Sequence, residues 1–122
     1  MNSKLEDNNT TISYFKKEIE RFVKERRWTK FHNPKDLIQA LSIEVSELSE
    51  IFLFNDLSLD TIHNDKDLLE NISDEIADVF IYLVSLLNSL DVDLTSAFVR
   101  KMKKNEDKYT KEEFYDGSYR KL

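Results

Sequence analysis

Two pairs of carboxylates interrupt the two most apolar stretches of this sequence. Glu44 and Glu47 lie within LIQALSIEVSELSEIF, and Glu75 and Asp78 lie within ISDEIADVFIYLVSLL. The spacing of three residues places both carboxylates of a pair on one face of a helix. Charges are rarely placed at core-facing positions unless a partner offsets the cost of desolvation. The pattern therefore predicts two helices whose acids converge, with a hard divalent cation such as Mg²⁺ as the obvious partner.

The scarcity of glycine and proline, one of each in 122 residues, points to an all-α fold. Sheet proteins need glycine in their turns, and a glycine-rich phosphate loop cannot be built here. Leu, Ile, Lys and Glu dominate the composition, and the length suits a single domain. Cysteine is absent, which excludes a disulfide framework, a zinc ribbon and a thiol nucleophile.

Apolar periodicity and capping residues predict four helices. The expected helices cover about residues 11–27, 34–54, 67–90 and 96–109, and a loop covers 55–66. The expected N-caps are Thr10 or Thr11 for the first helix, Asn33 followed by Pro34 for the second, and Asp93 or Thr95 for the fourth. We expect a disordered N-terminus over residues 1–10, one domain over 11–110 and a C-terminal tail over 111–122.

The apolar stripes of the second and third helices show where the acids lie. The second stripe is Leu37, Leu41, Glu44, Leu48 and Ile51, and the third is Leu68, Ile72, Ile76, Val79, Leu83, Leu86 and Leu90. Glu44 thus occupies a position where a hydrophobic residue is expected. The third helix is apolar nearly all round, so we expect a second subunit to cover it and the protein to be a homo-oligomer.

Charge is distributed unevenly along the chain. Residues 44–78 contain 11 acids and one base, whereas residues 100–111 contain six bases and two acids. The net charge of −6 argues against binding of polymeric nucleic acid. The longest apolar run, residues 76–87, is interrupted by Asp78, and the N-terminus is polar. We therefore expect a cytoplasmic protein without a membrane partner.

The four acids allow more than one interpretation. Facing pairs of carboxylates can hold cations and leave coordination positions open for water and phosphate oxygens. Alternatively, the acids bind Lys or Arg of neighbouring helices, or the chain is a helical interaction module with an acidic surface. A carboxylate-bridged di-iron bundle would require Glu-x-x-His on two helices, whereas positions 47 and 78 are Glu and Asp.

The acid pattern resembles that of a known family. Glu44-x-x-Glu47, a spacer of 27 residues and Glu75-x-x-Asp78 are similar to the motifs of the MazG-type all-α nucleoside triphosphate pyrophosphohydrolases. The resemblance extends from about Phe22 to Tyr109 and is strongest to the small dCTP pyrophosphatase-like subgroup. It implies a four-helix-bundle-like protomer assembled as a dimer or tetramer. It also implies Mg²⁺-dependent hydrolysis, with Mn²⁺ as a substitute, of a nucleoside triphosphate to monophosphate and pyrophosphate in nucleotide house-cleaning.

The resemblance also assigns roles to single residues. It implies that Glu44, Glu47, Glu75 and Asp78 bind the metal, and that Glu44 or Glu47 is also the catalytic base. The implied substrate-binding residues are Trp28, His32, Phe54, Tyr82, Lys101 and Asn105. The chain departs from the pattern at Phe54, where the closest relatives carry tryptophan. Acceptance of pyrimidine nucleotides beyond dCTP, modified forms included, and a related dUTP-type activity therefore stay open.

Overall fold

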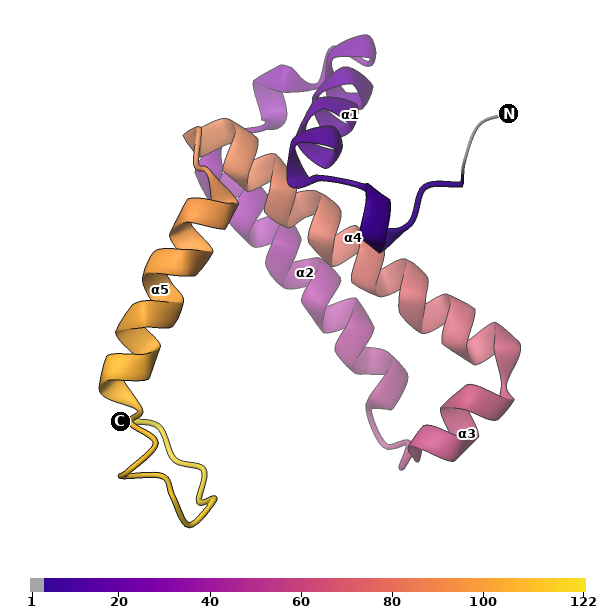
Figure 1. Cartoon of the computed structure of the whole chain (residues 1–122). Helices are drawn as coiled ribbons and strands as arrows, with labels where there is room; N and C mark the ends of the chain where they lie inside the picture. The colour runs from indigo at the N-terminus through magenta and orange to yellow at the C-terminus, as the bar shows by residue number, and fades with distance from the viewer. Residues whose placement is uncertain (1–3) are drawn as a thin grey trace. The chain divides into compact units, whose positions relative to one another are not determined.

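The computed structural model describes residues 4–122 and is all-helical (Figure 1). Its elements are the 3-10 turns η1 (Asp7–Asn9) and η2 (Thr29–Phe31) and the helices α1 (Ile12–Glu25), α2 (Pro34–Phe52), α3 (Leu59–Asn64), α4 (Lys66–Leu90) and α5 (Leu94–Lys108). No strand occurs within the described range. The expectation of an all-α fold is confirmed.

Side-chain caps fix the starts of three predicted helices. The Thr11 hydroxyl accepts a hydrogen bond from the Tyr14 N–H at 3.1 Å. Asn33 accepts from the Asp36 N–H at 3.0 Å, with Pro34 at the first helical position. Asp93 caps α5 by accepting from the Ser96 N–H at 3.0 Å. These caps satisfy amide groups that have no partner within the helix.

The expected loop over residues 55–66 is wrong in part, because it contains the short helix α3. The Ser58 hydroxyl caps α3 by accepting from the Thr61 N–H at 3.1 Å. Ile62 is buried, and α3 packs against α4. A polar segment with a serine cap and a single buried isoleucine thus forms one and a half turns of helix, because tertiary contact supplies the stability that such a short helix lacks.

The chain forms two compact units, Met1–Asp91 and Val92–Leu122. In the first unit, α2 and α4 lie side by side in opposite directions, and α1 packs on α4 (Figure 1). The buried hydrophobic residues of this unit are Val23, Leu37, Ile62, Ile72, Val84 and Leu87. In the second unit, Phe114 of the tail lies against Tyr109 at the end of α5, with ring centroids 5.6 Å apart.

The predicted stripe of α2 is confirmed, whereas that of α4 is wrong at two positions. Leu37, Leu41, Glu44, Leu48 and Ile51 are all buried or half-buried. On α4, Ile76 is 52 % exposed and Leu90 is 51 % exposed. Glu75, the neighbour of Ile76, takes the half-buried position instead. On the inner face the Glu75 carboxylate approaches that of Glu44 on α2, as described below.

The N-terminal segment expected to be disordered lies partly outside the described residues, which begin at position 4. Within residues 4–10, η1 is closed by a capping box. The Glu6 N–H donates to Asn9 Oδ1 at 2.8 Å. The division into segments 1–10, 11–110 and 111–122 stays a prediction. Over the range 4–122, no helix has both the length and the apolar character required to cross a bilayer.

Leu37 anchors the first turn of α2, and its side chain is only 2 % exposed. We expect Leu37→Ala to lower the free energy of unfolding by about 2–5 kcal/mol, because it removes buried methyl groups and leaves a cavity. Chemical denaturation measures the effect. Leu59→Ala is the matched control, since Leu59 is 73 % exposed and should cost less than about 1 kcal/mol. Equal losses in the two variants would contradict the assigned core.

Candidate functional site

Three of the four predicted acids converge between α2 and α4. Glu44 of α2 and Glu75 and Asp78 of α4 each offer one carboxylate oxygen, and these oxygens lie within 4.8 Å of one another. We call these three residues the acid cluster. The antiparallel packing of α2 and α4 brings together residues that are more than thirty positions apart in the sequence. The convergence expected from the sequence is therefore present for these three residues.

The environment of the acid cluster fits a hard cation. Glu44 Oε2 and Glu75 Oε2 are buried and have no hydrogen-bond partner. The ion pairs found among the described residues involve other acids, mainly along α1, so Lys or Arg neutralisation of the cluster is not observed there. Unpaired buried carboxylates are costly. An oxygen-only donor set with two unsatisfied oxygens suits a divalent cation of the Mg²⁺ or Ca²⁺ kind.

Crowding of negative charge shifts the acid–base equilibria of the cluster. Burial raises the pKa of Glu44, and the neighbouring Glu47 carboxyl raises it further by hydrogen bonding and by charge. Burial likewise raises the pKa of Glu75, and the charges of Glu47 and Asp78 add to it. Both shifts favour the protonated form of these carboxyls.

Glu47 differs from the other three acids in its position. It is exposed and does not belong to the set of oxygens within 4.8 Å. Its effect on the pKa values of Glu44 and Glu75 nevertheless places its carboxyl beside both. Glu47 is thus at the solvent side of the acid cluster, where a carboxylate can accept a proton from a water molecule.

Two cavities lie against the part of α4 that follows the acid cluster. The first, of about 390 Å³, is lined by Ala40, one turn before Glu44, and by Tyr82, one turn after Asp78. We call it the cluster-side cavity. The second, of about 270 Å³, is lined mainly by hydrophobic and aromatic groups, and we call it the apolar cavity. Trp28, His32 and Tyr82 line both cavities. Three predicted substrate-binding residues are therefore brought together around these two cavities.

The end of α1 orients Trp28. Arg27 adopts a left-handed conformation with φ 57°, the Trp28 N–H donates to the Val23 carbonyl, and the Arg27 N–H donates to the Lys24 carbonyl, each at 3.0 Å. This Schellman pattern turns the chain sharply after the helix. The Trp28 ring then contacts Phe22 edge-on, with centroids 6.0 Å apart. Trp28 remains 45 % exposed, so part of its ring is open for stacking.

His32 lies at the end of η2, where its backbone N–H donates to the Thr29 carbonyl at 3.0 Å. Burial lowers the pKa of its imidazole. A neutral imidazole offers one donor and one acceptor. His32 can therefore exchange hydrogen bonds with an uncharged polar group of a ligand.

Three predicted substrate-binding residues are not part of this group. Phe54 is 97 % exposed, has φ 61° and lines none of the cavities described here. Lys101 and Asn105 lie on α5, in the second unit. Lys101 is exposed, and the Asn105 carbonyl accepts the C-terminal hydrogen bond of α5 from Tyr109 at 2.7 Å. The substrate-binding roles of all three stay predictions.

Sequence reasoning missed the polar residues of α4 beyond Tyr82. Ser85 lines the apolar cavity, and its side chain is buried, at 3 % exposure. Ser85 and Asn88 have the same spacing of three residues, within an apolar run, that drew attention to the acid pairs. Polar interruptions of an apolar helix are thus the signal that could have identified them.

Comparison with known proteins places the chain in a family. Residues 39–120 match the MazG-like family. The chain belongs to the MazG-like family. The resemblance stated from the acid motifs is confirmed, and so is the similarity to dCTP pyrophosphatases. The match includes the acid cluster and extends through α5 into the tail.

Relatives within the MazG-like family include dCTP pyrophosphatase 1 of Mus musculus and of Homo sapiens. Each is 36 % identical over 89 residues, which is 72 % of this chain and 52 % of the relative. The chain thus spans about half the length of the curated relatives it matches. The crystal structure of a pyrophosphatase from Archaeoglobus fulgidus is 34 % identical, with a TM-score of 0.74. That similarity covers 88 % of this chain and 99 % of the archaeal chain.

Proposed function

We propose that the protein hydrolyses (deoxy)nucleoside triphosphates to monophosphate and pyrophosphate with Mg²⁺, or with Mn²⁺ as a substitute. The observation that carries this proposal is the acid cluster, with its two orphaned carboxylate oxygens, one helical turn from a cavity lined by Trp28. A cation site beside an aromatic cavity suits a ligand that is polyanionic at one end and flat at the other. The names of the relatives, dCTP pyrophosphatase and pyrophosphatase, support the same reaction.

In the proposed mechanism, Glu44, Glu75 and Asp78 would hold the cation, and Glu47 would be its fourth protein ligand. The bound cation would supply positive charge to the triphosphate and acidify a coordinated water. Glu47, which is exposed and raises the pKa of the neighbouring Glu44, takes the proton of the attacking water. The bond between the α-phosphorus and the oxygen that bridges to the β-phosphorus breaks. Lys101 is the proposed partner for the charge of the leaving pyrophosphate.

The base and sugar are proposed to bind in the cavities beside the acid cluster. Trp28 offers a face for base stacking, His32 exchanges hydrogen bonds with the base or sugar, and Tyr82 lies between this region and the triphosphate. Phe54 and Asn105 complete the proposed set of substrate contacts. A pyrimidine such as dCTP is the proposed substrate, and dUTP is the alternative that a substrate panel separates.

We also propose that the protein works as a homo-oligomer. Large hydrophobic side chains on the outer faces of α2 and α4 remain exposed, namely Ile38, Ile43, Val45, Ile76, Ile81 and Leu90. Exposed apolar surface of this extent is typical of a subunit interface. A helical interaction module would place its acids on the outer face, whereas Glu44 and Glu75 are half-buried between helices. The proposed setting is nucleotide house-cleaning in the cytoplasm.

The first test is pyrophosphate release from a panel of canonical and modified nucleoside triphosphates. We expect release with Mg²⁺, none with EDTA, and the monophosphate as the second product. The ranking of substrates then identifies the base. No release from any nucleotide by a folded preparation would overturn the proposed function.

Replacing Trp28 tests the proposed stacking surface. We expect Trp28→Ala to lower kcat/KM for the best nucleotide about 10-fold to 100-fold, because base–aromatic stacking contributes about 1–3 kcal/mol per base. Steady-state kinetics with the best nucleotide of the panel measure the loss. Tyr14→Ala is the matched control, since Tyr14 is a comparably exposed aromatic residue of α1 that lines none of the cavities. An equal loss in both variants would argue against Trp28 as the stacking surface.

A further inference from the structure

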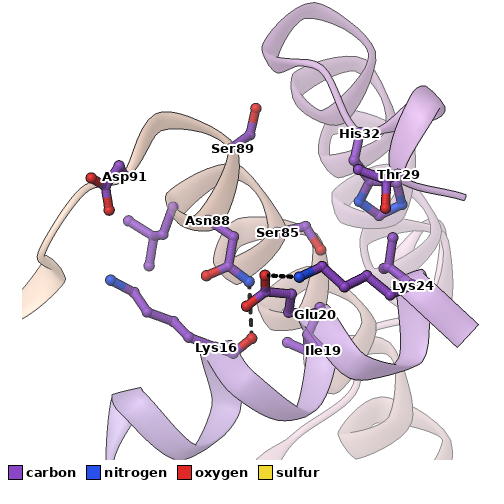
Figure 2. Close-up of a pocket in the computed structure, with 12 residues that line it drawn as sticks. Lys16, Ile19, Glu20, Lys24, Thr29, His32, Ser85, Asn88, Ser89 and Asp91 are labelled. Atoms are coloured by element: carbon purple, nitrogen blue, oxygen red, sulfur yellow. Dashed lines mark hydrogen bonds and ion pairs between the residues drawn. The ribbon is translucent and has the colours of Figure 1, made fainter.

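Helix α1 is fixed against α4 at two places. Asn88 Nδ2 donates to the Lys16 backbone carbonyl at 3.0 Å (Figure 2). The rings of Phe15 and Phe80 meet edge-on, with centroids 5.1 Å apart. Between α1 and the last turns of α4 lies a third cavity, of about 320 Å³, which shares His32 with the other two cavities (Figure 2). Side chains at the end of α1 thus project from a helix whose position these contacts set.

The two basic residues Lys24 and Arg26 at the end of α1 have different partners. Lys24 forms an ion pair of 2.7 Å with Glu20 at the wall of the third cavity (Figure 2). Arg26 lines none of the three cavities. Its ion-pair partner Glu25 is 4.0 Å away, and Glu25 already binds Arg21 at 2.7 Å. An ion pair therefore does not explain where the Arg26 side chain lies.

The Arg26 guanidinium lies over the ring of Phe22. Its central carbon is 3.7 Å from the ring centroid, and Nη1 donates to the Phe22 backbone carbonyl at 3.0 Å. The hydrogen bond anchors the guanidinium over the ring of the same residue. A cation over an aromatic face is attracted by the ring quadrupole, and the planar group of arginine also stacks on the ring. Arg26 thus covers one face of a ring that is 43 % exposed.

Phe22 passes this constraint on to Trp28. The planes of the two rings meet at 68°, with centroids 6.0 Å apart, and both residues line the apolar cavity. The turn at Arg27 sets the backbone of Trp28, but it does not set the orientation of an indole ring that is nearly half exposed. Packing against Phe22 therefore restricts an orientation that burial alone leaves free.

We propose that Arg26 is a positioning residue of the base site: by holding the Phe22 ring, it keeps the Trp28 indole in the orientation in which the base stacks on it. Arg26 lines no cavity and does not belong to the acid cluster. Ordering a side chain in advance lowers the entropy cost of binding, so its contribution lies in affinity rather than in the chemical step. The inference rests on the proposed function, because it assumes a base that stacks on Trp28.

The first measurement needs no nucleotide, because Trp28 is the only tryptophan of the chain and the tryptophan fluorescence reports on that ring alone. We expect Arg26→Gln to lower the fluorescence anisotropy and to raise the rate constant of acrylamide quenching about twofold, since an unsupported exposed side chain changes rotamer within nanoseconds. Lys17→Gln is the matched control, because it removes one positive charge from an exposed position of α1 that lines none of the cavities. It should leave both quantities at their native values. Values in Arg26→Gln equal to those of the control would overturn the inference.

Steady-state kinetics with the best nucleotide of the panel give the second readout. We expect Arg26→Gln to raise KM about threefold to fivefold and to leave kcat within about twofold of the native value, because an exposed cation–π contact is weak and the reacting groups are untouched. Lys17→Gln should change neither quantity, which separates loss of the ring's support from loss of a charge that attracts the triphosphate. A fall in kcat with an unchanged KM would contradict a positioning role at the base site.

A double-mutant cycle distinguishes positioning from helix capping, since Arg26 also satisfies a carbonyl at the C-terminal end of α1. Phe22→Leu removes the ring and keeps the carbonyl, and neither Phe22 nor Arg26 belongs to the buried core. If Arg26 acts through the ring, Arg26→Gln should raise KM no further in the Phe22→Leu background. An equal rise in both backgrounds would assign Arg26 to capping alone, and the inference would be wrong.

Failure of the proposed function gives a different result from failure of this inference. If the native protein hydrolyses no nucleotide, the proposed function is wrong, and the fluorescence measurement alone then decides whether Arg26 orients Trp28. If the native protein is active and Arg26→Gln matches Lys17→Gln in both fluorescence and KM, the function stands and only the role of Arg26 is wrong.

Discussion

Replacing Glu75 with glutamine is expected to lower kcat by at least about a thousandfold and, without metal, to raise the unfolding temperature. Activity falls because a neutral amide is a poor ligand for a hard cation. Without the cation, the negative charge of the triphosphate is no longer neutralised, and the activation barrier rises by several kcal/mol. Stability rises because the substitution removes one negative charge from a cluster where Glu47 and Asp78 already raise the pKa of Glu75. Opposite signs for activity and stability distinguish a ligand from a core residue.

The measurements are pyrophosphate release with Mg²⁺ and thermal unfolding in EDTA. Glu70→Gln is the matched control, because Glu70 is an exposed acid on the same helix with no place in the acid cluster. It should change neither quantity by more than a small amount. A Glu75→Gln protein that keeps a tenth of the activity, or that unfolds earlier than the parent in EDTA, would contradict the assigned role.

Magnesium is expected to stabilise the protein strongly above neutral pH and very little near pH 5. The folded-state pKa values of Glu44 and Glu75 are raised above the ordinary glutamate value of 4.5 by burial and by the neighbouring acids. Between that value and the raised ones the folded state binds more protons than the unfolded state, so without metal these groups make stability fall as pH rises. Cation binding requires the deprotonated carboxylates, and it therefore competes with protons as the pH falls.

At a hundredfold excess over its Kd, the cation should add about 2.7 kcal/mol, which corresponds to a rise in Tm of about 10 °C for a chain of this size. Thermal unfolding at pH 5 and pH 8, with and without Mg²⁺, measures the difference. His32 works in the opposite direction, since burial lowers its pKa and acidification below 6.5 destabilises the fold. That contribution is common to both conditions and cancels in the comparison. The double variant Glu44→Gln/Glu75→Gln should show no response, and an equal response at both pH values would argue against a carboxylate site.

Local sequence signals predicted the helices well, because their causes are local. Thr11, Asn33 and Asp93 cap helices through bonds to amides three residues away, and such bonds depend on nothing distant. The stripe of α2 follows from helical periodicity in the same way. The helix α3 escaped detection because its stability comes from Ile62 packed on α4, a contact that no local pattern contains.

Apolar periodicity alone did not predict which residues of α4 face inward. The apolar stripe predicted Ile76 on the inner face, because hydrophobic residues usually take the buried positions. The structure turns Glu75 inward instead, where its carboxylate lies beside Glu44, and leaves Ile76 at 52 % exposure. One residue is a rotation of about 100° on a helix. Whether Glu75 or Ile76 points inward depends on how α4 packs against α2, which the periodicity of α4 alone does not contain.

The sequence by itself determined the all-helical class and the two pairs of acids on α2 and α4, because spacing and residue type carry that information, whereas Trp28 was predicted from the resemblance to the family. Only the tertiary structure decided that carboxylate oxygens of Glu44, Glu75 and Asp78 lie close together, whereas Glu47 is not part of this set. It also decided that three cavities lie one after another along α4. The physical reason is that a cavity is defined by surfaces from several helices. Ser85 and Asn88, for example, line a cavity only because α1 forms its opposite wall.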